Sequence, residues 1–265
     1  MKRSSSPHPW QRGFTLTELA VVLVIVALLL GGLLLPLSAQ IELRNINDNR
    51  KAMAEIREAL LGYAVVHGRL PCAAKPDLAS QATGAGVEMT QGAGGPCDPR
   101  VLAGVLPWVT LGVSESDAWG RRYSYRVSST FARSVPPPTD AVSGCDPVPP
   151  IPVNAAFPLC ARGDISIRSA KAGVLVATEV PAVIISHGNN GHGAYTPEGS
   201  RLPSGADADE LENQILVGPA PDWTDHPEEK AFVRRSAPTA TYDDEVVWIP
   251  PGLLFNRMIT AGKLP

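Results

Sequence analysis

One uninterrupted apolar run near the start of the chain constrains its fold more than any other feature. Residues 19–37 read LAVVLVIVALLLGGLLLPL and contain no charged or polar side chain. As a helix this run would rise by about 28 Å, close to the roughly 30 Å of hydrocarbon in a bilayer. No other stretch of the sequence is comparable, so the sequence predicts at most one membrane span.

The residues that precede the apolar run carry three positive charges, at Lys2, Arg3 and Arg12. The positive-inside rule predicts that this end stays in the cytoplasm and that everything after Leu37 lies beyond the membrane. A plain membrane anchor and a cleaved secretory signal are simpler explanations. The first leaves the carboxylate of Glu18, at the edge of the run, without a role. The second usually has an apolar run of only about 7–15 residues.

The eight residues 12–19 read RGFTLTEL. This pattern resembles the cleavage and methylation signature of type IV pilins and type II secretion pseudopilins. In that family a short basic leader ends in Gly, the mature chain opens on Phe, and a Glu stands four residues later. The resemblance implies that a prepilin peptidase cuts between Gly13 and Phe14, that the new amine of Phe14 is methylated, and that Glu18 serves assembly.

The same resemblance implies a structural subunit, stored in the inner membrane as a single-pass protein with its head in the periplasm. Such a subunit assembles into a type IV pilus or a type II secretion pseudopilus. Its implied partners are the prepilin peptidase, other pilins or pseudopilins, and the inner-membrane assembly platform. The large head favours a minor subunit over the major one.

Electrostatics supports the role of Glu18 in assembly. An ionised carboxylate beside hydrocarbon is costly unless it is paired. Cleavage would create a cation at Phe14, and Glu18 of a neighbouring subunit would neutralise it. Docking would then remove two unpaired charges and fix the axial register between subunits.

Beyond the apolar run the sequence becomes amphipathic. Apolar residues recur at intervals of three, four and seven, which is one face of a helix, and charged residues lie largely off that face. The pattern predicts one helix from Phe14 to His67, with a kink or melted turn near Gly31, Gly32 and Pro36. The apolar face consists of Ile46, Met53, Ile56, Leu60 and Tyr63.

Short β-forming runs separated by turn residues follow this helix, at residues 122–128, 165–168, 174–178 and 182–186. Residues 251–261 have helical spacing and predict a short terminal helix. The predicted fold is α+β and pilin-like, with a long N-terminal helix, membrane-spanning in its first half, packed on an antiparallel β-sheet head. The predicted divisions are a leader (1–13), a transmembrane and polymerisation helix (14–37), an amphipathic stalk (38–68) and a head (69–265).

All four cysteines lie beyond the apolar run. An even number of cysteines in an exported domain favours disulfides. Local pairing is one of three connectivities and would close two surface loops. A zinc site built from four thiolates is the alternative, although no CxxC spacing is present. The local pairs are Cys72 with Cys97 and Cys145 with Cys160.

A Gly/Asn-rich turn and the acidic residues after it raise the question of a bound cation. Calcium-binding pseudopilins have a Gly/Asp/Asn-rich loop late in the head, followed by an acidic run, and oxygen ligands suit Ca²⁺. This chain departs from that compact pattern, because sixteen residues separate Asn190 from Asp207. A solvated acidic loop is the alternative. The implied ligands are Asn189, Asn190, Asp207, Asp209 and Glu210, with Asp243 and Asp244 as a second acidic pair.

Other classes of function find less support. His187 and His192 are the most enzyme-like pair, but no nucleophile elbow, HExxH helix or phosphate loop accompanies them, so we expect no enzyme. A net charge of −3 argues against nucleic acid as a partner. A binding module or adhesin displayed on a pilin stalk stays open. The tripeptide at 162–164 (Arg-Gly-Asp) favours a turn, and the aromatic run of Trp108, Trp119, Tyr123 and Tyr125 favours a core wall.

Overall fold

The computed structural model describes residues 14–92, 97, 102–135, 145, 152, 154–215, 231–239 and 241–264, with side chains for all of these except residues 30–38. The predicted leader, residues 1–13, lies outside the described residues, and Gly13 with it. The chain divides into two compact units, Met1–Asn45 and Ile46–Pro265, which are described separately below.

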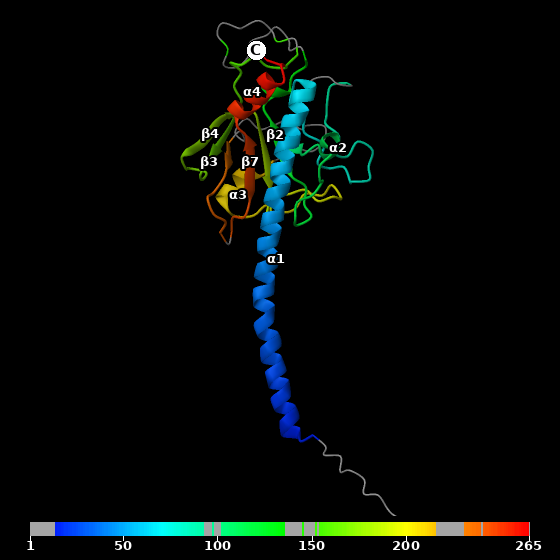
Figure 1. Ribbon diagram of the computed structural model, residues 1–265, viewed down its shortest axis with the longest axis vertical. Helices are drawn as coiled ribbons and strands as arrows, with labels where there is room; N and C mark the ends of the chain where they lie inside the picture. Colours follow the sequence, from blue (N-terminus) through cyan, green and yellow to red (C-terminus); the bar gives the residue numbers. More distant parts are fainter. Residues whose placement is uncertain are drawn as a thin grey trace, which may run out of the picture. The chain divides into compact units, whose positions relative to one another are not determined.

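The first helix, α1, extends over Leu16–His67 and has 52 residues (Figure 1). It ends at the predicted position, where Gly68 adopts a φ of 74° that only glycine tolerates easily. The helix is continuous through residues 31–36, so the predicted melted turn is absent. Pro36 removes one backbone donor, but the leucines on both sides are strong helix formers and keep the helical conformation.

In the first unit, α1 exposes apolar side chains. Leu19, Leu28 and Leu29 are 57%, 71% and 62% exposed, and Phe14 is 86% exposed. Exposed apolar surfaces of this kind mark sites of contact with proteins or membranes. No helix formed by the described residues is both long and apolar enough to cross a membrane. Within the predicted span, the side chains of residues 30–37 lie outside those that the structure describes.

The second unit contains a four-stranded antiparallel sheet. Its strands are β1 (Ala103–Val105), β2 (Ser124–Val127), β5 (Ala182–Ser186) and β7 (Glu245–Ile249). Their order is β1-β2-β5-β7, so β7 is an edge strand. Ile184 of the central strand β5 lies opposite Tyr125 on one side and Val247 on the other.

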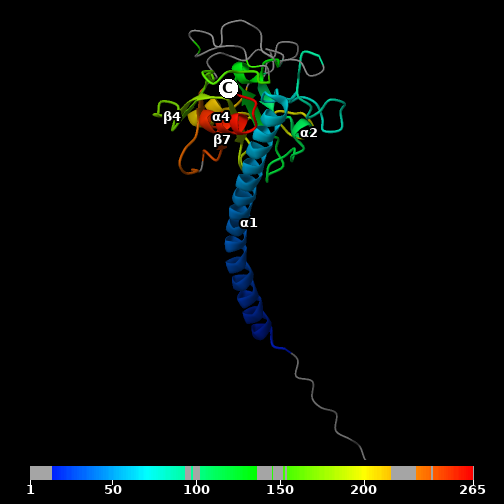
Figure 2. The same ribbon diagram turned by 45° about the horizontal axis from the view of Figure 1, so that its top comes forward.

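A second sheet has three strands in the order β4-β3-β6. They are β3 (Ile165–Arg168), β4 (Leu175–Val180) and β6 (Ala231–Val233), and β3 pairs antiparallel with β4 but parallel with β6. The shorter helices are α2 (Trp108–Leu111), the 3-10 helix η1 (Ser129–Ala132), α3 (Ala208–Asn213) and α4 (Pro251–Thr260). Figure 2 shows α4 beside the end of α1, where Arg257 donates to Glu58 at 2.9 Å.

The four-stranded sheet has a hydrophobic core on each face. On one face Met53, Ile56 and Leu60 of α1 pack against Tyr125 and Ile184. The core on the other face lies between the two sheets. Because side chains alternate along a strand, neighbours on one strand enter different cores. The second core includes Ile165, Ile167, Val183, Ile185, Phe232 and Val246.

The α+β class, with a long N-terminal helix and an antiparallel sheet in the head, is confirmed. The runs at 122–128, 165–168, 174–178 and 182–186 contain or overlap β2, β3, β4 and β5, and the terminal helix is α4. Three strands were not predicted: β1, β6 and β7. Of these β1 and β6 have only three residues each, too few to show a period of two. The parallel pairing of β6 also departs from a purely antiparallel head.

The apolar face of α1 leads to a prediction about stability. Leu60 is fully buried, so Leu60→Ala should leave a cavity and lower the free energy of unfolding by roughly 3 kcal/mol. Val66 on the same helix is 67% exposed, and Val66→Ala should cost less than about 0.5 kcal/mol. Urea unfolding of the full chain in detergent micelles, followed by tryptophan fluorescence, measures both. Equal costs would show that α1 does not anchor the head.

Candidate functional site

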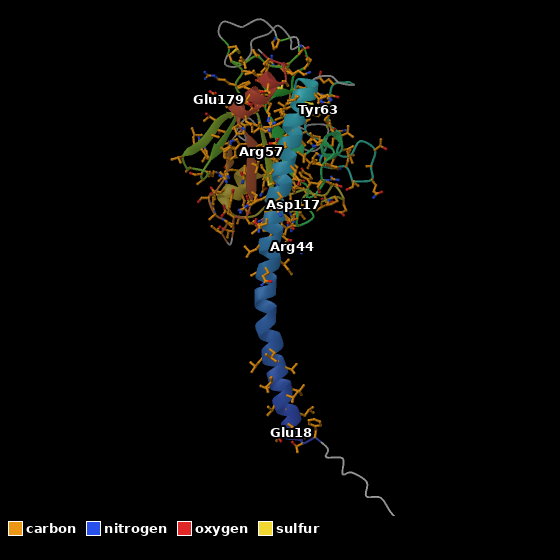
Figure 3. All side chains as sticks on the ribbon, in the orientation of Figure 1. Glu18, Arg44, Arg57, Tyr63, Asp117 and Glu179 are labelled. Carbon is orange, nitrogen blue, oxygen red and sulfur yellow. A yellow bond between two sulfur atoms is a disulfide. The ribbon has the colours of Figure 1, made fainter. Side chains whose placement is uncertain are left out.

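The start of α1 has a reciprocal cap made by the residues of the predicted processing signature. The backbone N–H and the hydroxyl of Thr15 donate to Oε2 of Glu18 at 2.8 and 2.7 Å. In return the N–H of Glu18 donates to Oγ1 of Thr15 at 3.3 Å. This is a capping box, and its T-x-x-E spacing was visible in the sequence. Glu18, labelled in Figure 3, therefore has a local role besides the predicted one in assembly.

The structure contains the two local disulfides, Cys72–Cys97 and Cys145–Cys160. No cysteine is free. A zinc site of four thiolates is therefore absent, since every sulfur is bonded to another. Each bridge closes a short loop and stabilises the head mainly by restricting the unfolded chain.

Three of the predicted calcium ligands come together in the head. Carboxylate oxygens of Glu210, Asp243 and Asp244 all lie within 4.8 Å of one another. Glu210 comes from α3, whereas the two aspartates directly precede β7. Glu210 accepts hydrogen bonds from Nδ2 of Asn190 at 2.6 Å and from the backbone N–H of Asp243 at 3.1 Å. We call Glu210, Asp243, Asp244 and Asn190 the acidic cluster.

Electrostatic repulsion within the acidic cluster is only partly relieved. One oxygen each of Asp243 and Asp244 is buried and has no hydrogen-bond partner. Burial, together with the carboxylates of Glu210 and Asp244, raises the pKa of Asp243 to about 6. Burial likewise raises the pKa of Asp244. Oδ1 of Asp244 lies 3.5 Å from Nδ1 of His187, so a cation would satisfy chiefly Oδ1 of Asp243, and it would reduce the repulsion among the three carboxylates.

The residues present therefore fit a cation that prefers oxygen ligands. Three carboxylates match the ligand type of Ca²⁺, although Ca²⁺ would need further oxygens to reach its usual six to eight. The amide of Asn190 donates through Nδ2 to Glu210, and its Oδ1 accepts from the backbone N–H of His192 at 2.9 Å. A cation held here would supply neutralising charge, and it would tie the 187–192 turn, α3 and the start of β7 together. The contribution would be to stability rather than to a reaction.

The structure places the other predicted ligands elsewhere. Asp207 is the N-cap of α3 and accepts from the backbone N–H of Asp209 at 2.9 Å. Both aspartates bind Arg235, at 3.2 Å for Asp207 and 2.6 Å for Asp209. Arg235 thus offsets part of their charge, and the three residues form a separate ion cluster. Asn189 helps only through its backbone, whose hydrogen bond lowers the pKa of Asp243 against the effect of burial.

The two histidines have different surroundings. His192 lies 3.1 Å from Oε2 of Glu210, at the rim of the acidic cluster. His187 is fully buried, with Nε2 2.9 Å from Oγ of Ser124 and Nδ1 3.5 Å from Asp244. The order of groups is that of a Ser-His-Asp triad. However, Ser124 lies within β2 and is only 1% exposed, so no substrate reaches its hydroxyl.

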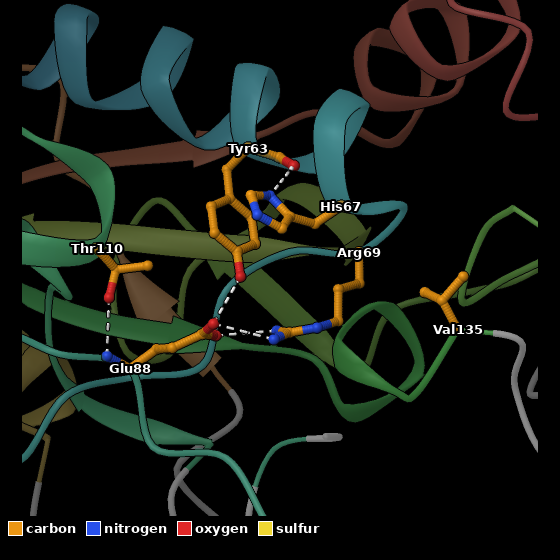
Figure 4. Close-up of a pocket in the computed structure, with 6 residues that line it drawn as sticks. All are labelled: Tyr63, His67, Arg69, Glu88, Thr110 and Val135. Atoms are coloured by element: carbon orange, nitrogen blue, oxygen red, sulfur yellow. Dashed lines mark hydrogen bonds and ion pairs between the residues drawn. The ribbon is translucent and has the colours of Figure 1, made fainter. Parts of the chain in front are cut away.

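A cavity of about 450 Å³ lies at the end of α1 (Figure 4). Glu88 is its central residue: it accepts from Nη1 and Nη2 of Arg69 at 2.9 and 3.0 Å and from the hydroxyl of Tyr63 at 2.6 Å. The backbone N–H of Cys72 also donates to Glu88 at 3.0 Å. The ring of His67 stacks on Tyr63 with centroids 3.9 Å apart.

This network ties a loop to the long helix, next to the first disulfide. Burial pushes the pKa of Glu88 up, but the hydrogen bonds from Arg69, Tyr63 and the Cys72 amide outweigh it and lower the pKa. Burial and the contact with Glu88 raise the pKa of Tyr63. Because these polar groups satisfy one another, we assign the network a structural role. The sequence held one signal for it, since Glu88 is the only charged residue between 79 and 95.

Two further motifs have structural roles. In the Arg-Gly-Asp tripeptide, Arg162 forms an ion pair with Glu179 at 3.0 Å, and the Cα of Gly163 packs against the backbone of Val180, where a side chain would not fit. The tripeptide directly precedes β3, as expected. The predicted core wall against the long helix is confirmed for Tyr123 and Tyr125. Trp108 is buried in a separate cluster with Tyr195, and Trp119 is half-buried.

The Glu88 network leads to a prediction. Glu88→Gln keeps the shape but leaves the buried guanidinium of Arg69 without a counter-charge, which should cost roughly 3 kcal/mol at pH 7. Because the folded-state pKa of Glu88 lies below its ordinary 4.5, the difference from wild type should persist above pH 4.5 and fade as the pH falls further. Urea unfolding at several pH values measures this. Glu58→Gln, which breaks the exposed pair with Arg257, should cost under about 1 kcal/mol, and an equal cost would contradict the assignment.

Comparison with known proteins identifies one segment. Residues 11–34 match the family model described as the prokaryotic N-terminal methylation motif. No curated protein and no solved structure matches the chain. The matched residues include Gly13, Phe14 and Glu18, the residues on which the resemblance was based. The chain therefore carries a type IV pilin-like N-terminal signature, which indicates a protein that is processed by prepilin peptidase and assembles with other pilins.

Proposed function

We propose that this chain is a structural subunit of a type IV pilus or a type II secretion pseudopilus. In this proposal it is a minor subunit, stored in the inner membrane as a single-pass protein with its head in the periplasm. The observation that carries the proposal is the methylation motif at residues 11–34, in which the Gly13-Phe14 junction, Glu18 and the apolar helix follow in register. The partners are the prepilin peptidase, other pilins or pseudopilins, and the assembly platform.

The exposed first part of α1 supports assembly through this helix. Leu19, Leu28 and Leu29 leave more than half of their surface uncovered. Burying such side chains fully is worth about 1.5–3 kcal/mol each, so lipid or neighbouring helices would stabilise the chain substantially. In the fibre, the helices of other subunits take the place of lipid.

Processing would let Glu18 exchange its hydrogen bonds in the capping box for an ion pair with another subunit. In the described chain its carboxylate is satisfied by Thr15 at the helix start. Cleavage after Gly13 creates a charged amine at Phe14, two residues before the first residue of α1. A carboxylate at this position then has a cationic partner on the adjacent subunit, and the ion pair fixes the register between subunits.

We propose no catalytic role for the head. The arrangement of Ser124, His187 and Asp244 described above resembles a catalytic triad, but Ser124 is buried. A nucleophile must be accessible to its substrate, and this serine is not. Ser124→Ala should therefore leave assembly intact. An ester-hydrolysing activity that disappears in this variant would contradict the proposal.

The central prediction concerns processing. In cells that contain prepilin peptidase, intact-mass analysis of the membrane-extracted protein should show a chain that begins at N-methylated Phe14. Gly13→Leu should block cleavage, because the peptidase must accommodate the residue before the cut. Glu18→Ala should be cleaved normally yet fail to enter fibres, whereas Glu42→Ala, an acid further along α1, should assemble.

The controls make this test decisive. A chain that begins at Met1 with and without the peptidase would refute processing. Normal fibre entry by Glu18→Ala would refute the pairing with Phe14 but leave cleavage standing. Deleting the genes for pilus or secretion machinery, one system at a time, then shows which fibre takes up the subunit.

We also propose that the acidic cluster binds Ca²⁺, on the basis of its three carboxylates within 4.8 Å of one another and the buried Oδ1 of Asp243, which has no hydrogen-bond partner. Ca²⁺ at about one hundred times its Kd should raise the Tm by about 5 °C. Asp243→Asn should abolish the rise. Asp207→Asn, which disturbs the neighbouring ion cluster instead, should lower the Tm but keep the response to Ca²⁺. An unchanged Tm, or an equal rise in Asp243→Asn, would refute calcium binding at this site; differential scanning calorimetry measures all three.

A further inference from the structure

The outer edge of β7 combines unpaired backbone with positive charge. β7 is the last strand in the order β1-β2-β5-β7, so one of its sides has no strand partner among the described residues. A groove of about 210 Å³ lies here. A second hollow of about 360 Å³ shares Arg234 with it. The groove is lined by Arg57, Arg234, Val246, Val247, Trp248 and Pro250.

The two arginines approach this edge from opposite faces of the sheet. Arg57 belongs to α1, which covers the face to which Val247 contributes; Figure 3 labels Arg57 on this part of the helix. Arg234 directly follows β6 of the second sheet, and its guanidinium lies 5.6 Å from the ring centroid of Trp248. Trp248 packs against the core between the two sheets. The edge is thus flanked by a cation on each side.

Neither arginine is neutralised within the described part of the chain. Nε of Arg57 is buried and has no hydrogen-bond partner, and Arg234 contacts only an aromatic ring with its guanidinium. Two carboxylates on the same elements already have arginine partners. Glu58, next to Arg57 in sequence, is bound by Arg257 at 2.9 Å, and Glu245 of β7 is bound by another arginine at 2.6 Å.

We propose that this edge binds an extended, acidic segment of a partner protein, which adds a strand beside β7. Strand addition draws affinity from main-chain hydrogen bonds and specificity from the side chains on either face. Carboxylates of the segment would pair with Arg57 and Arg234, while Trp248 offers an apolar surface to its other side chains. Charge complementarity selects this occupant, since a neutral or basic strand would leave both cations unpaired.

The geometry also predicts where the acids stand in the bound segment. Successive side chains of a strand point to opposite faces of a sheet. Because Arg57 and Arg234 lie on opposite faces, the two acids that pair with them must differ in residue number by an odd number, such as i and i+1. Two adjacent acids meet this condition, whereas acids two positions apart reach the same face and leave one arginine unpaired.

The competing explanation is protective. Proteins often place charged side chains beside edge strands to prevent pairing with other chains. A protective edge would reject acidic and basic strands alike, whereas a docking edge distinguishes them. The inference does not rest on the proposed pilus function, because it concerns the head of the chain whether or not its leader is cleaved.

The test measures fluorescence anisotropy with the full chain in detergent micelles and labelled seven-residue peptides. The probe is Val-Thr-Glu-Glu-Val-Thr-Val, compared with versions that carry Lys-Lys or the same-face pair Glu-Thr-Glu, and with a backbone N-methylated version that cannot pair with an edge. The acidic probe should bind at least about tenfold more tightly than each of the other three. N-methylation tests strand addition, and the two charge variants test the arginines.

Matched variants of the chain locate the site. Arg234→Glu alters an exposed side chain and should weaken the acidic probe about tenfold without loss of folding. Arg57→Glu combined with Arg234→Glu should reverse the preference toward the Lys-Lys probe. Arg162→Glu, a charge reversal at another exposed arginine, should leave the affinity unchanged. Equal binding of acidic and basic probes, tight binding of the N-methylated probe, or an unchanged affinity in Arg234→Glu would each overturn the proposal.

Discussion

The packing of one face of α1 against the four-stranded sheet is the interaction on which the head depends. Met53, Ile56 and Leu60 are buried together with Tyr125 and Ile184 from the middle of the sheet. The same sheet carries the second core on its other face, so both layers are held through this contact. Loss of the helix would expose much of one face of the sheet, so we expect the head to depend on the second part of α1 for its stability.

Buried charge holds the loops to this framework. Arg122 is fully buried, and its guanidinium donates to Glu115 and to the carbonyl oxygens of Pro76 and Leu78. Glu88 gathers four donors in the same way at the end of α1. In such a head nearly every buried charge has a partner, as the cost of burial requires. Among the described residues, Oδ1 of Asp243 in the acidic cluster and Nε of Arg57 beside β7 are buried without a hydrogen-bond partner, and each lies at one of the two proposed ligand sites.

The sequence was sufficient where the signal is local. The extent of α1, the strands β2 to β5 and the terminal helix follow from periodicity and turn residues, whereas the sequence left the pairing of the four cysteines open among three connectivities. The remaining features depend on contacts between distant segments. β6 has three residues and pairs parallel with β3, a partner more than sixty positions earlier. The acidic cluster brings Glu210 together with Asp243 and Asp244, whereas the neighbouring Asp209 forms an ion pair with Arg235. The spacing of these residues in the sequence does not show which of the two carboxylates, Asp209 or Glu210, joins the cluster.

The N-terminal segment and the head therefore give information about different aspects of function. The N-terminal signature concerns twenty-odd residues and indicates how the protein is processed and assembled. It places no constraint on what the head contacts, because assembly uses the apolar helix, whereas recognition uses side chains that lie outside that motif. Nε of Arg57 is buried without a hydrogen-bond partner among the described residues, and a neutral residue there would avoid the cost of desolvating a charge. In the proposed complex a carboxylate of the partner would offset that cost, which is the physical reason for proposing that the head has a role in recognition in addition to packing around the helix.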